Sequence, residues 1–97
     1  MVTYITLAKF TDQGIRTIKD TTKRADMAKE MAGKFGVKMN NIFWTNGEYD
    51  MVTISEADDD ESITAFGLML SATGNVRFQA LKAFNREEMG RILSKIP

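Results

Sequence analysis

Along the chain, segments in which hydrophobic and polar residues alternate, as in strands, are interspersed with segments that have the spacing of hydrophobic residues typical of helices. Val2–Phe10 is rich in β-branched and aromatic residues and predicts a strand with Ile5 and Leu7 on one face. Thr11–Gly14 interrupts this run as a turn, and apolar residues three positions apart after it predict a short helical piece.

The segment that follows predicts the first long helix, because its apolar residues form a stripe beneath a charged outer face. Asp20–Thr22 offers candidate N-caps, and Gly36 is a plausible C′ residue that ends the helix. The stripe consists of Ala25, Ala28, Met31, Ala32 and Phe35.

An Asn-Gly pair at 46–47 separates two apolar runs and predicts a β-hairpin formed by Val37–Thr45 and Tyr49–Ser55. A type I′ turn at this pair would place Trp44 opposite Tyr49 and Ile42 opposite Met51. Because side chains in a strand alternate between faces, the hairpin then has two mostly apolar faces. One face carries Ile42, Trp44, Tyr49, Met51 and Thr53, and the other carries Phe43, Asp50, Val52 and Ile54.

An acidic run, Asp58–Glu61, precedes a helix over Ile63–Ala72 that is apolar nearly all the way round. Acidic residues stabilise a helix N-terminus, and they also ligate divalent cations. We favour the capping role and expect no metal, since a calcium loop needs ligands at loop spacing with a glycine inside. An apolar helix in so short a chain is most simply covered by a second subunit.

A fourth strand is predicted over Val76–Phe84, and Asn85–Glu88 has the pattern of a capping box before a terminal helix that reaches Ile96. The order βαββαβ is the split βαβ arrangement of ferredoxin-like α+β folds, with both main helices on one face of a four-stranded antiparallel sheet. We expect Phe43, Val52 and Ile54 to point to the helices. The open face would then carry Ile42, Trp44, Tyr49 and Met51 and pack against a second copy in a dimeric α+β barrel.

The composition bounds the size and the chemistry of the chain. Its 97 residues are enough for one domain, 1–97, with a single core. Thirteen basic and thirteen acidic residues balance, so we expect no nucleic-acid partner. Histidine and cysteine are absent, which excludes the commonest general base, thiolate nucleophiles, and histidine or thiolate metal ligation.

The first ten residues do not have the pattern of a leader peptide, and no run approaches the ~20 apolar residues of a membrane span. We therefore expect a cytoplasmic protein without a membrane partner. The methionines Met31, Met51 and Met69 are expected to fill irregular core or interface gaps, since no tight cluster points to copper.

Gly47-Glu48-Tyr49-Asp50, with Trp44 upstream and Gly74–Arg77 downstream, resembles the GYD-domain family. The resemblance covers nearly the whole chain, including Lys9–Gly14 and the opening of the last helix. It implies membership of the dimeric α+β barrel group, which includes cofactor-independent oxygenases, small isomerases, haem-degrading enzymes and many members without known activity. Kinship of this kind implies a fold more readily than a function.

Five residues form the candidate site. Tyr49 is a candidate proton donor and Asp50 a candidate base, while Trp44, Lys9 and Arg77 are candidate ligand-binding residues. Neighbouring strand residues point to opposite faces, so Tyr49 and Asp50 share a pocket only if a bulge redirects one of them. In the competing structural interpretation, Trp44 and Tyr49 form a cross-strand pair and Asp50 fastens a loop or a helix end.

Two functions remain open at this point. The first is a small homo-oligomeric binding or interaction protein, with a small-molecule ligand as a further option. The second is a cofactor-independent enzyme of oxygenase or isomerase type that acts on a small aromatic or lactone-like molecule through Tyr49 and Asp50. We expect no cofactor in either case.

Overall fold

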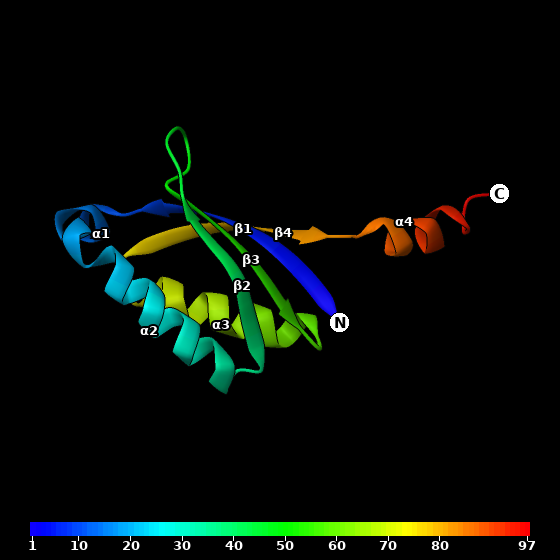
Figure 1. Ribbon diagram of the computed structural model, residues 1–97, viewed down its shortest axis with the longest axis horizontal. Coiled ribbons are helices and arrows are strands. Elements are labelled where there is room, and N and C mark those ends of the chain that lie inside the picture. The colour runs from blue at the N-terminus through cyan, green and yellow to red at the C-terminus, as the bar shows by residue number, and fades with distance from the viewer.

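The computed structural model describes residues 1–97 as a four-stranded antiparallel sheet with two long helices on one of its faces (Figure 1). The strand order is β2-β3-β1-β4. This confirms the predicted α+β class and βαββαβ order. The elements are β1 (Val2–Phe10), α1 (Asp12–Arg16), the 3₁₀ helix η1 (Ile18–Asp20), α2 (Thr21–Lys34), β2 (Val37–Trp44), β3 (Met51–Ala57), α3 (Asp60–Ala72), β4 (Val76–Ala83) and α4 (Arg86–Leu93).

Side-chain caps begin three of the helices; those of α3 and α4 were predicted, whereas Thr11–Gly14 was predicted as a turn and the predicted cap of α2 at Asp20–Thr22 makes no side-chain capping hydrogen bond. The carboxylate of Asp59 accepts a hydrogen bond of 2.7 Å from the backbone N–H of Ser62, so the acidic run does cap α3. Asn85 and Glu88 form a reciprocal capping box at the start of α4. Thr11 caps α1 by accepting from the N–H of Gly14. Each cap satisfies backbone donors that a helix leaves unpaired.

The buried core is small and lies at one end of the interface between the helices and the sheet. Only 11 of the 97 residues are buried. The rings of Phe35 and Phe66 pack at 5.7 Å and tie the end of α2 to α3. The core cluster is Ala32, Val37, Met39, Ala57, Ile63 and Phe66. Most of the remaining apolar residues are half-buried or exposed, so the chain alone leaves much apolar surface in contact with water.

The predicted tight turn at Asn46-Gly47 is wrong. Strand β2 ends at Trp44 and β3 begins at Met51, so a six-residue loop joins them. Gly47 has a positive φ of 114°, but no residue other than glycine does, so Asn46 cannot occupy a type I′ turn. The end of the loop is hydrogen-bonded to strand β1 and not closed into a tight turn, because the N–H of Asp50 donates to the carbonyl of Ala8 at 2.8 Å.

The loop shifts the hairpin register by two residues, so Trp44 is paired with Met51 rather than with Tyr49. A two-residue shift leaves the strand faces unchanged, because the side-chain period is two. The predicted grouping of Ile42, Trp44, Met51 and Thr53 on one face therefore holds. A β-bulge at Asn40 also places Met39 on that face.

The predicted orientation of the two faces is wrong. Ile42, Met51 and Thr53 face the helices and line the space beneath them. Val52 is paired with Leu7, and Ile54 with Ile5, on the face that no helix covers. The prediction assumed that the face with Phe43, Val52 and Ile54 packs against the helices because it is uniformly apolar, whereas this face is the uncovered one.

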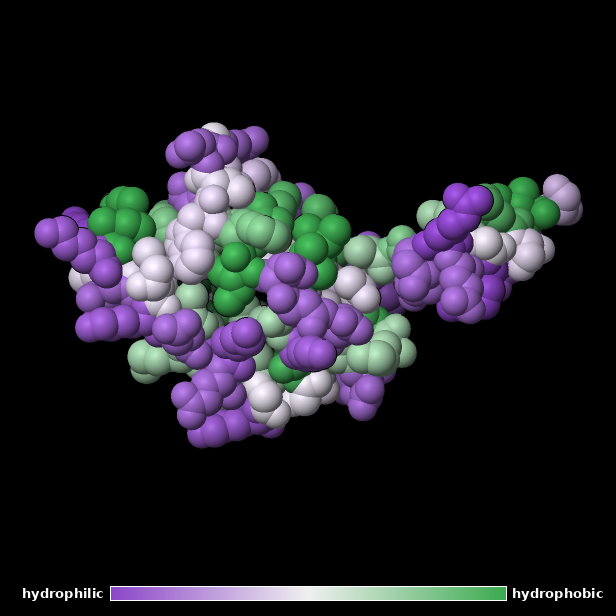
Figure 2. Space-filling view, viewed as in Figure 1, coloured by the Kyte–Doolittle hydropathy of each residue, from purple (hydrophilic) through white to green (hydrophobic).

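Helix α4 extends away from the sheet and forms a separate lobe behind a narrow neck (Figures 1 and 2). The radius of gyration is 14.7 Å, whereas a compact chain of this length has about 12.5 Å. The molecule is accordingly elongated, with extents of 52 × 31 × 19 Å. None of the helices has the length and apolar character needed to cross a membrane.

Candidate functional site

The uncovered side of the sheet, called the open face below, has an aliphatic centre and a polar end. Its apolar side chains come from all four strands and lie next to one another in the observed register. Phe43 is 52% exposed and Leu81 is 41% exposed, while the others are half-buried. The apolar residues of the open face are Ile5, Leu7, Phe43, Val52, Ile54 and Leu81.

Tyr49 and Lys9, two predicted site residues, meet at the polar end of the open face. The ammonium of Lys9 lies 5.2 Å from the centre of the Tyr49 ring, within cation–π range. Lys9 also pairs with Glu48 at 3.6 Å, and both side chains are largely exposed. The Tyr49 hydroxyl donates a hydrogen bond of 2.6 Å to Gln79 Oε1. Arg77 stands directly opposite Lys9 across the β1–β4 ladder.

Asp50 has a structural contact on a different element. Its carboxylate accepts a hydrogen bond of 2.9 Å from the backbone N–H of Phe10 at the end of β1. Together with the bond from its own N–H to Ala8, this contact fastens the hairpin loop to β1. The hydroxyl of Tyr49 and the carboxylate of Asp50 are thus each engaged within the chain, and their role as an acid–base pair stays a prediction.

Trp44 lies apart from Tyr49, so the predicted cross-strand aromatic pair does not form. Its indole N–H donates to the hydroxyl of Thr21 at 3.0 Å, which ties the end of β2 to the start of α2. The side chain is 44% exposed. Of the five predicted site residues, the structure brings Lys9, Tyr49 and Arg77 to one end of one face, while Trp44 and Asp50 serve other contacts.

A hydrogen-bonded cluster that the sequence reasoning missed lies where α3 begins. The carboxylate of Asp60 accepts from the hydroxyl of Tyr4 at 3.0 Å and from the ammonium of Lys82 at 3.1 Å. The bond from Lys82, followed by that from Tyr4, lowers the pKa of Asp60 below its usual value of 3.8. The bond to Asp60 raises the pKa of Tyr4 above 10.0. The register of β1 with β4 pairs Tyr4 with Lys82, and the start of α3 brings Asp60 to both of them.

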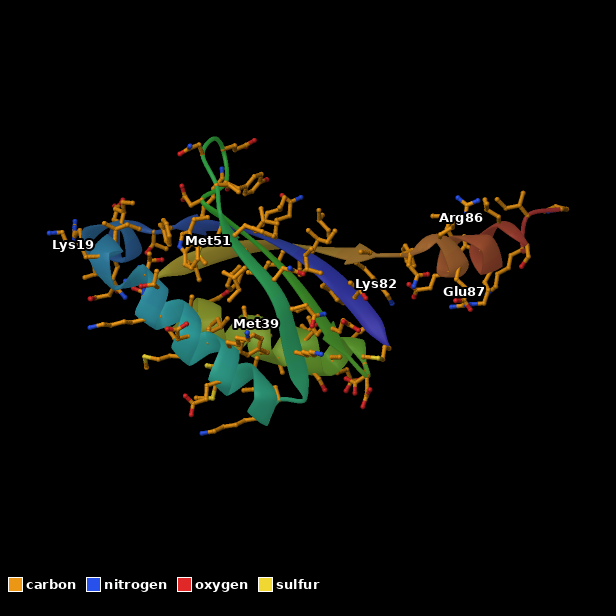
Figure 3. All side chains as sticks on the ribbon, in the orientation of Figure 1. Lys19, Met39, Met51, Lys82, Arg86 and Glu87 are labelled. Carbon is orange, nitrogen blue, oxygen red and sulfur yellow. The ribbon has the colours of Figure 1, made fainter.

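Lys82→Met should raise the pKa of Asp60, and Tyr4→Phe should raise it by a smaller amount, because each removes a hydrogen bond that favours the carboxylate. Carbon-detected NMR titration of the Asp60 carboxyl group measures both shifts. Lys19→Met is the matched control, since Lys19 and Lys82 lie far apart (Figure 3). An Asp60 pKa equal in all four proteins would contradict the cluster.

The same cluster gives a pH window for stability. The folded-state pKa of Asp60 is depressed, so its contribution is present above pH 3.8 and is lost as the pH falls through the lower folded value. The folded-state pKa of Tyr4 is raised, so its contribution is present below pH 10.0 and is lost as the pH rises through the higher value. Since these groups are accessible to water, both contributions are small.

Comparison with known proteins finds one matching family and one similar protein. The GYD domain model matches residues 4–93. A protein of Thermus thermophilus, named glutamine synthetase and cystathionine beta-lyase binding protein, is 31% identical over 84 residues. That alignment covers 86% of this chain and 88% of the relative. No solved structure matches the chain.

The match extends from β1 into α4 and includes every strand of the sheet. It takes in the hairpin loop with Gly47, Tyr49 and Asp50 as well as the Gly74-Asn75 turn before β4. On this evidence the chain belongs to the GYD-domain family.

Proposed function

We propose that this chain is a small homo-oligomeric protein that binds other proteins, with two copies in contact through their open faces. The observation that carries the proposal is an excess of exposed surface. The chain exposes 6820 Å², whereas a compact monomer of its mass exposes about 5,600 Å². A standard interface buries roughly 800 Å² on each partner, so the excess, about 1,200 Å², is enough for one interface and part of another.

The open face has the character of a contact between copies. Its centre is aliphatic and free of charge, and it is rimmed by Lys9, Arg77 and Glu56. On protein surfaces, large exposed apolar patches with a polar rim mark interaction sites. Two antiparallel sheets pack well face to face with interdigitated aliphatic side chains, and a two-fold axis would make each patch cover the other. Face-to-face packing of this kind would build the dimeric α+β barrel.

Helix α4 offers a second, separate contact surface for a different protein. It carries an apolar stripe at positions i, i+3 and i+4 whose side chains are exposed, while Arg86, Glu87 and Arg91 lie outside the stripe. Amphipathic helices of this kind bind in apolar grooves of partner proteins. The stripe consists of Met89, Ile92 and Leu93, and the exposed Ile96 lies beyond the end of the helix, which ends at Leu93 and not at the predicted Ile96.

The relative's printed name supports a protein partner and suggests its class. A protein that is 31% identical over most of both chains is named for binding glutamine synthetase and cystathionine beta-lyase. We infer that this chain binds metabolic enzymes of that kind. Its absence of histidine and cysteine agrees with a role that does not require catalytic groups of those types.

Sedimentation velocity with purified glutamine synthetase and cystathionine beta-lyase from the same host tests the proposal. We expect the wild-type chain to co-sediment with at least one of the two enzymes at micromolar concentration. The double variant Ile92→Ser, Leu93→Ser should lose at least tenfold in affinity, because it removes two apolar anchors from the stripe. It should keep the oligomeric state of the free protein.

The matched control is Glu87→Gln on the exposed polar side of α4, where the side chain pairs with Arg91 at 3.4 Å. That exposed pair contributes little, so the control should bind as the wild type does. Failure of the wild-type chain to sediment with either enzyme would contradict the inferred partner class. Equal affinity of the wild-type chain and the double variant would exclude α4 as the contact surface.

A further inference from the structure

A cavity of about 500 Å³ lies between the sheet and helices α2 and α3. Its size falls within the roughly 300–1,000 Å³ of known small-molecule sites, and most of its lining is apolar. Met51 lies beside the hairpin loop and Met39 lies further along the strands, among the helices (Figure 3). Both residues line the cavity, which therefore extends along the strands.

Small side chains create this cavity. The floor of the sheet has Thr6, Ala8 and Thr53 where a packed core would have larger residues, and α2 and α3 contribute Ala28 and Gly67. A Cβ added at Gly67 would meet no atom within 4 Å. The large aliphatic side chains of the same strands lie on the open face instead. The chain thus leaves space under its helices, although it has residues that would fill it.

Three hydroxyl groups line the floor without a hydrogen-bond partner in the chain. Thr6 and Thr53 lie opposite each other on β1 and β3, and Ser55 follows Thr53 on the same face. Thr53 and Ser55 are 8% and 7% exposed. No side-chain polar atom that is fully closed off from solvent lacks a partner, so the unpaired hydroxyls open into the cavity. These hydroxyls have no partner in the chain, and a ligand oxygen in the cavity would supply one.

The cavity offers no free charge. Arg24 is the only ionic residue in its lining. Its guanidinium already donates to the carbonyls of Thr17 and Gly14 at 3.0 and 3.1 Å and to the hydroxyl of Thr17. The hydroxyl of Tyr4, which also lines the cavity, donates to Asp60. A charged ligand would lose its water shell here without gaining a counter-ion.

We propose that this cavity binds a neutral, largely apolar small molecule with one or two hydroxyl or carbonyl oxygens. The oxygen atoms would hydrogen-bond to Thr6, Thr53 and Ser55, and the remainder would contact the alanine, methionine and phenylalanine side chains. The proposal is independent of the contact between copies and of the protein partner, because neither the open face nor the α4 stripe lines the cavity.

Fluorescence titration of the purified protein with prodan, a neutral naphthalene ketone whose emission depends on hydrogen bonding to its carbonyl, tests this proposal. We expect saturable binding of one probe per chain. Gly67→Leu should weaken binding at least tenfold by filling the space next to α3. Thr53→Val should weaken it three- to tenfold and shift the emission of the bound probe to shorter wavelength, because the carbonyl loses a donor.

Thr22→Val is the matched control, since it makes the same chemical change at an exposed position on α2 outside the cavity. It should bind prodan as the wild type does. Ala28→Val fills the cavity from α2 and replaces Gly67→Leu if that variant unfolds. Wild-type protein that binds no probe, or filled and Thr53→Val variants that bind it with wild-type affinity and emission, would overturn the proposal.

Discussion

Replacing Ile54 by glutamate at the centre of the open face should separate the assembly into monomers. Ile54 is on β3, an inner strand, and is paired with Ile5 on β1. In a monomer the glutamate side chain would extend into water and leave the fold intact. Between two packed sheets it would place an unpaired carboxylate among aliphatic side chains, which costs several kcal/mol. We therefore expect the dissociation constant to rise at least about 100-fold.

Sedimentation velocity over a range of protein concentrations measures this change. Thr22→Glu introduces the same charge on the exposed surface of α2 and should leave the assembly unchanged. Circular dichroism spectra of both variants should match that of the wild type. A wild-type chain that is monomeric at micromolar concentration would contradict the assignment of the open face to a second copy.

Replacing Gly14 by alanine should destabilise the chain more than a glycine-to-alanine substitution at any other position. A Cβ at this position would lie 2.1 Å from the carbonyl oxygen of Asn75. That carbonyl accepts a hydrogen bond from the N–H of Thr11. The hydroxyl of Thr11 donates to the carbonyl of Gly74 at 2.5 Å. Relief of the clash would separate α1 from the turn before β4 and lengthen these bonds. We expect a loss of about 3 kcal/mol.

For a chain of this size such a loss lowers the melting temperature by on the order of 10–20 °C. Thermal unfolding followed by circular dichroism gives the value. Gly33→Ala in α2 is the control, because its Cβ would meet no atom within 4 Å. Alanine favours the helix by about 0.5–1 kcal/mol over glycine, so this variant should melt slightly above the wild type. Equal melting temperatures for wild type and Gly14→Ala would contradict the observed approach of α1 to Asn75.

The candidate site was only partly predictable because its contacts join distant segments. Gly47, Tyr49 and Asp50 were identified from the family pattern, and the structure brings Tyr49 to Lys9 on the open face. Gln79, which accepts the hydrogen bond from the Tyr49 hydroxyl, comes from β4, and no sequence pattern identifies it as a site residue. The same is true of the contact between Tyr4 and Asp60, which are 56 residues apart.

Local chemistry in the sequence determined the elements, their order and their caps. Strand alternation, the helical stripe of α2 and the cap residues Asp59 and Asn85 act within a few positions of one another, so the pattern alone predicts them. The α+β class and the βαββαβ order follow from those elements. The family followed from motifs that occur in the family's order along the chain.

Tertiary structure alone decided which side of the sheet the helices cover and how the hairpin closes. Both faces of the strands are mostly apolar, so hydrophobicity could not choose between them. The helices cover the face with small and hydroxyl-bearing residues and leave Val52 and Ile54 uncovered. The hairpin loop was decided by Asp50, whose carboxylate bonds to the end of β1, 40 residues away along the chain, and whose N–H bonds to the same strand. Contacts over such distances depend on the folded arrangement of all four strands, which no local pattern contains.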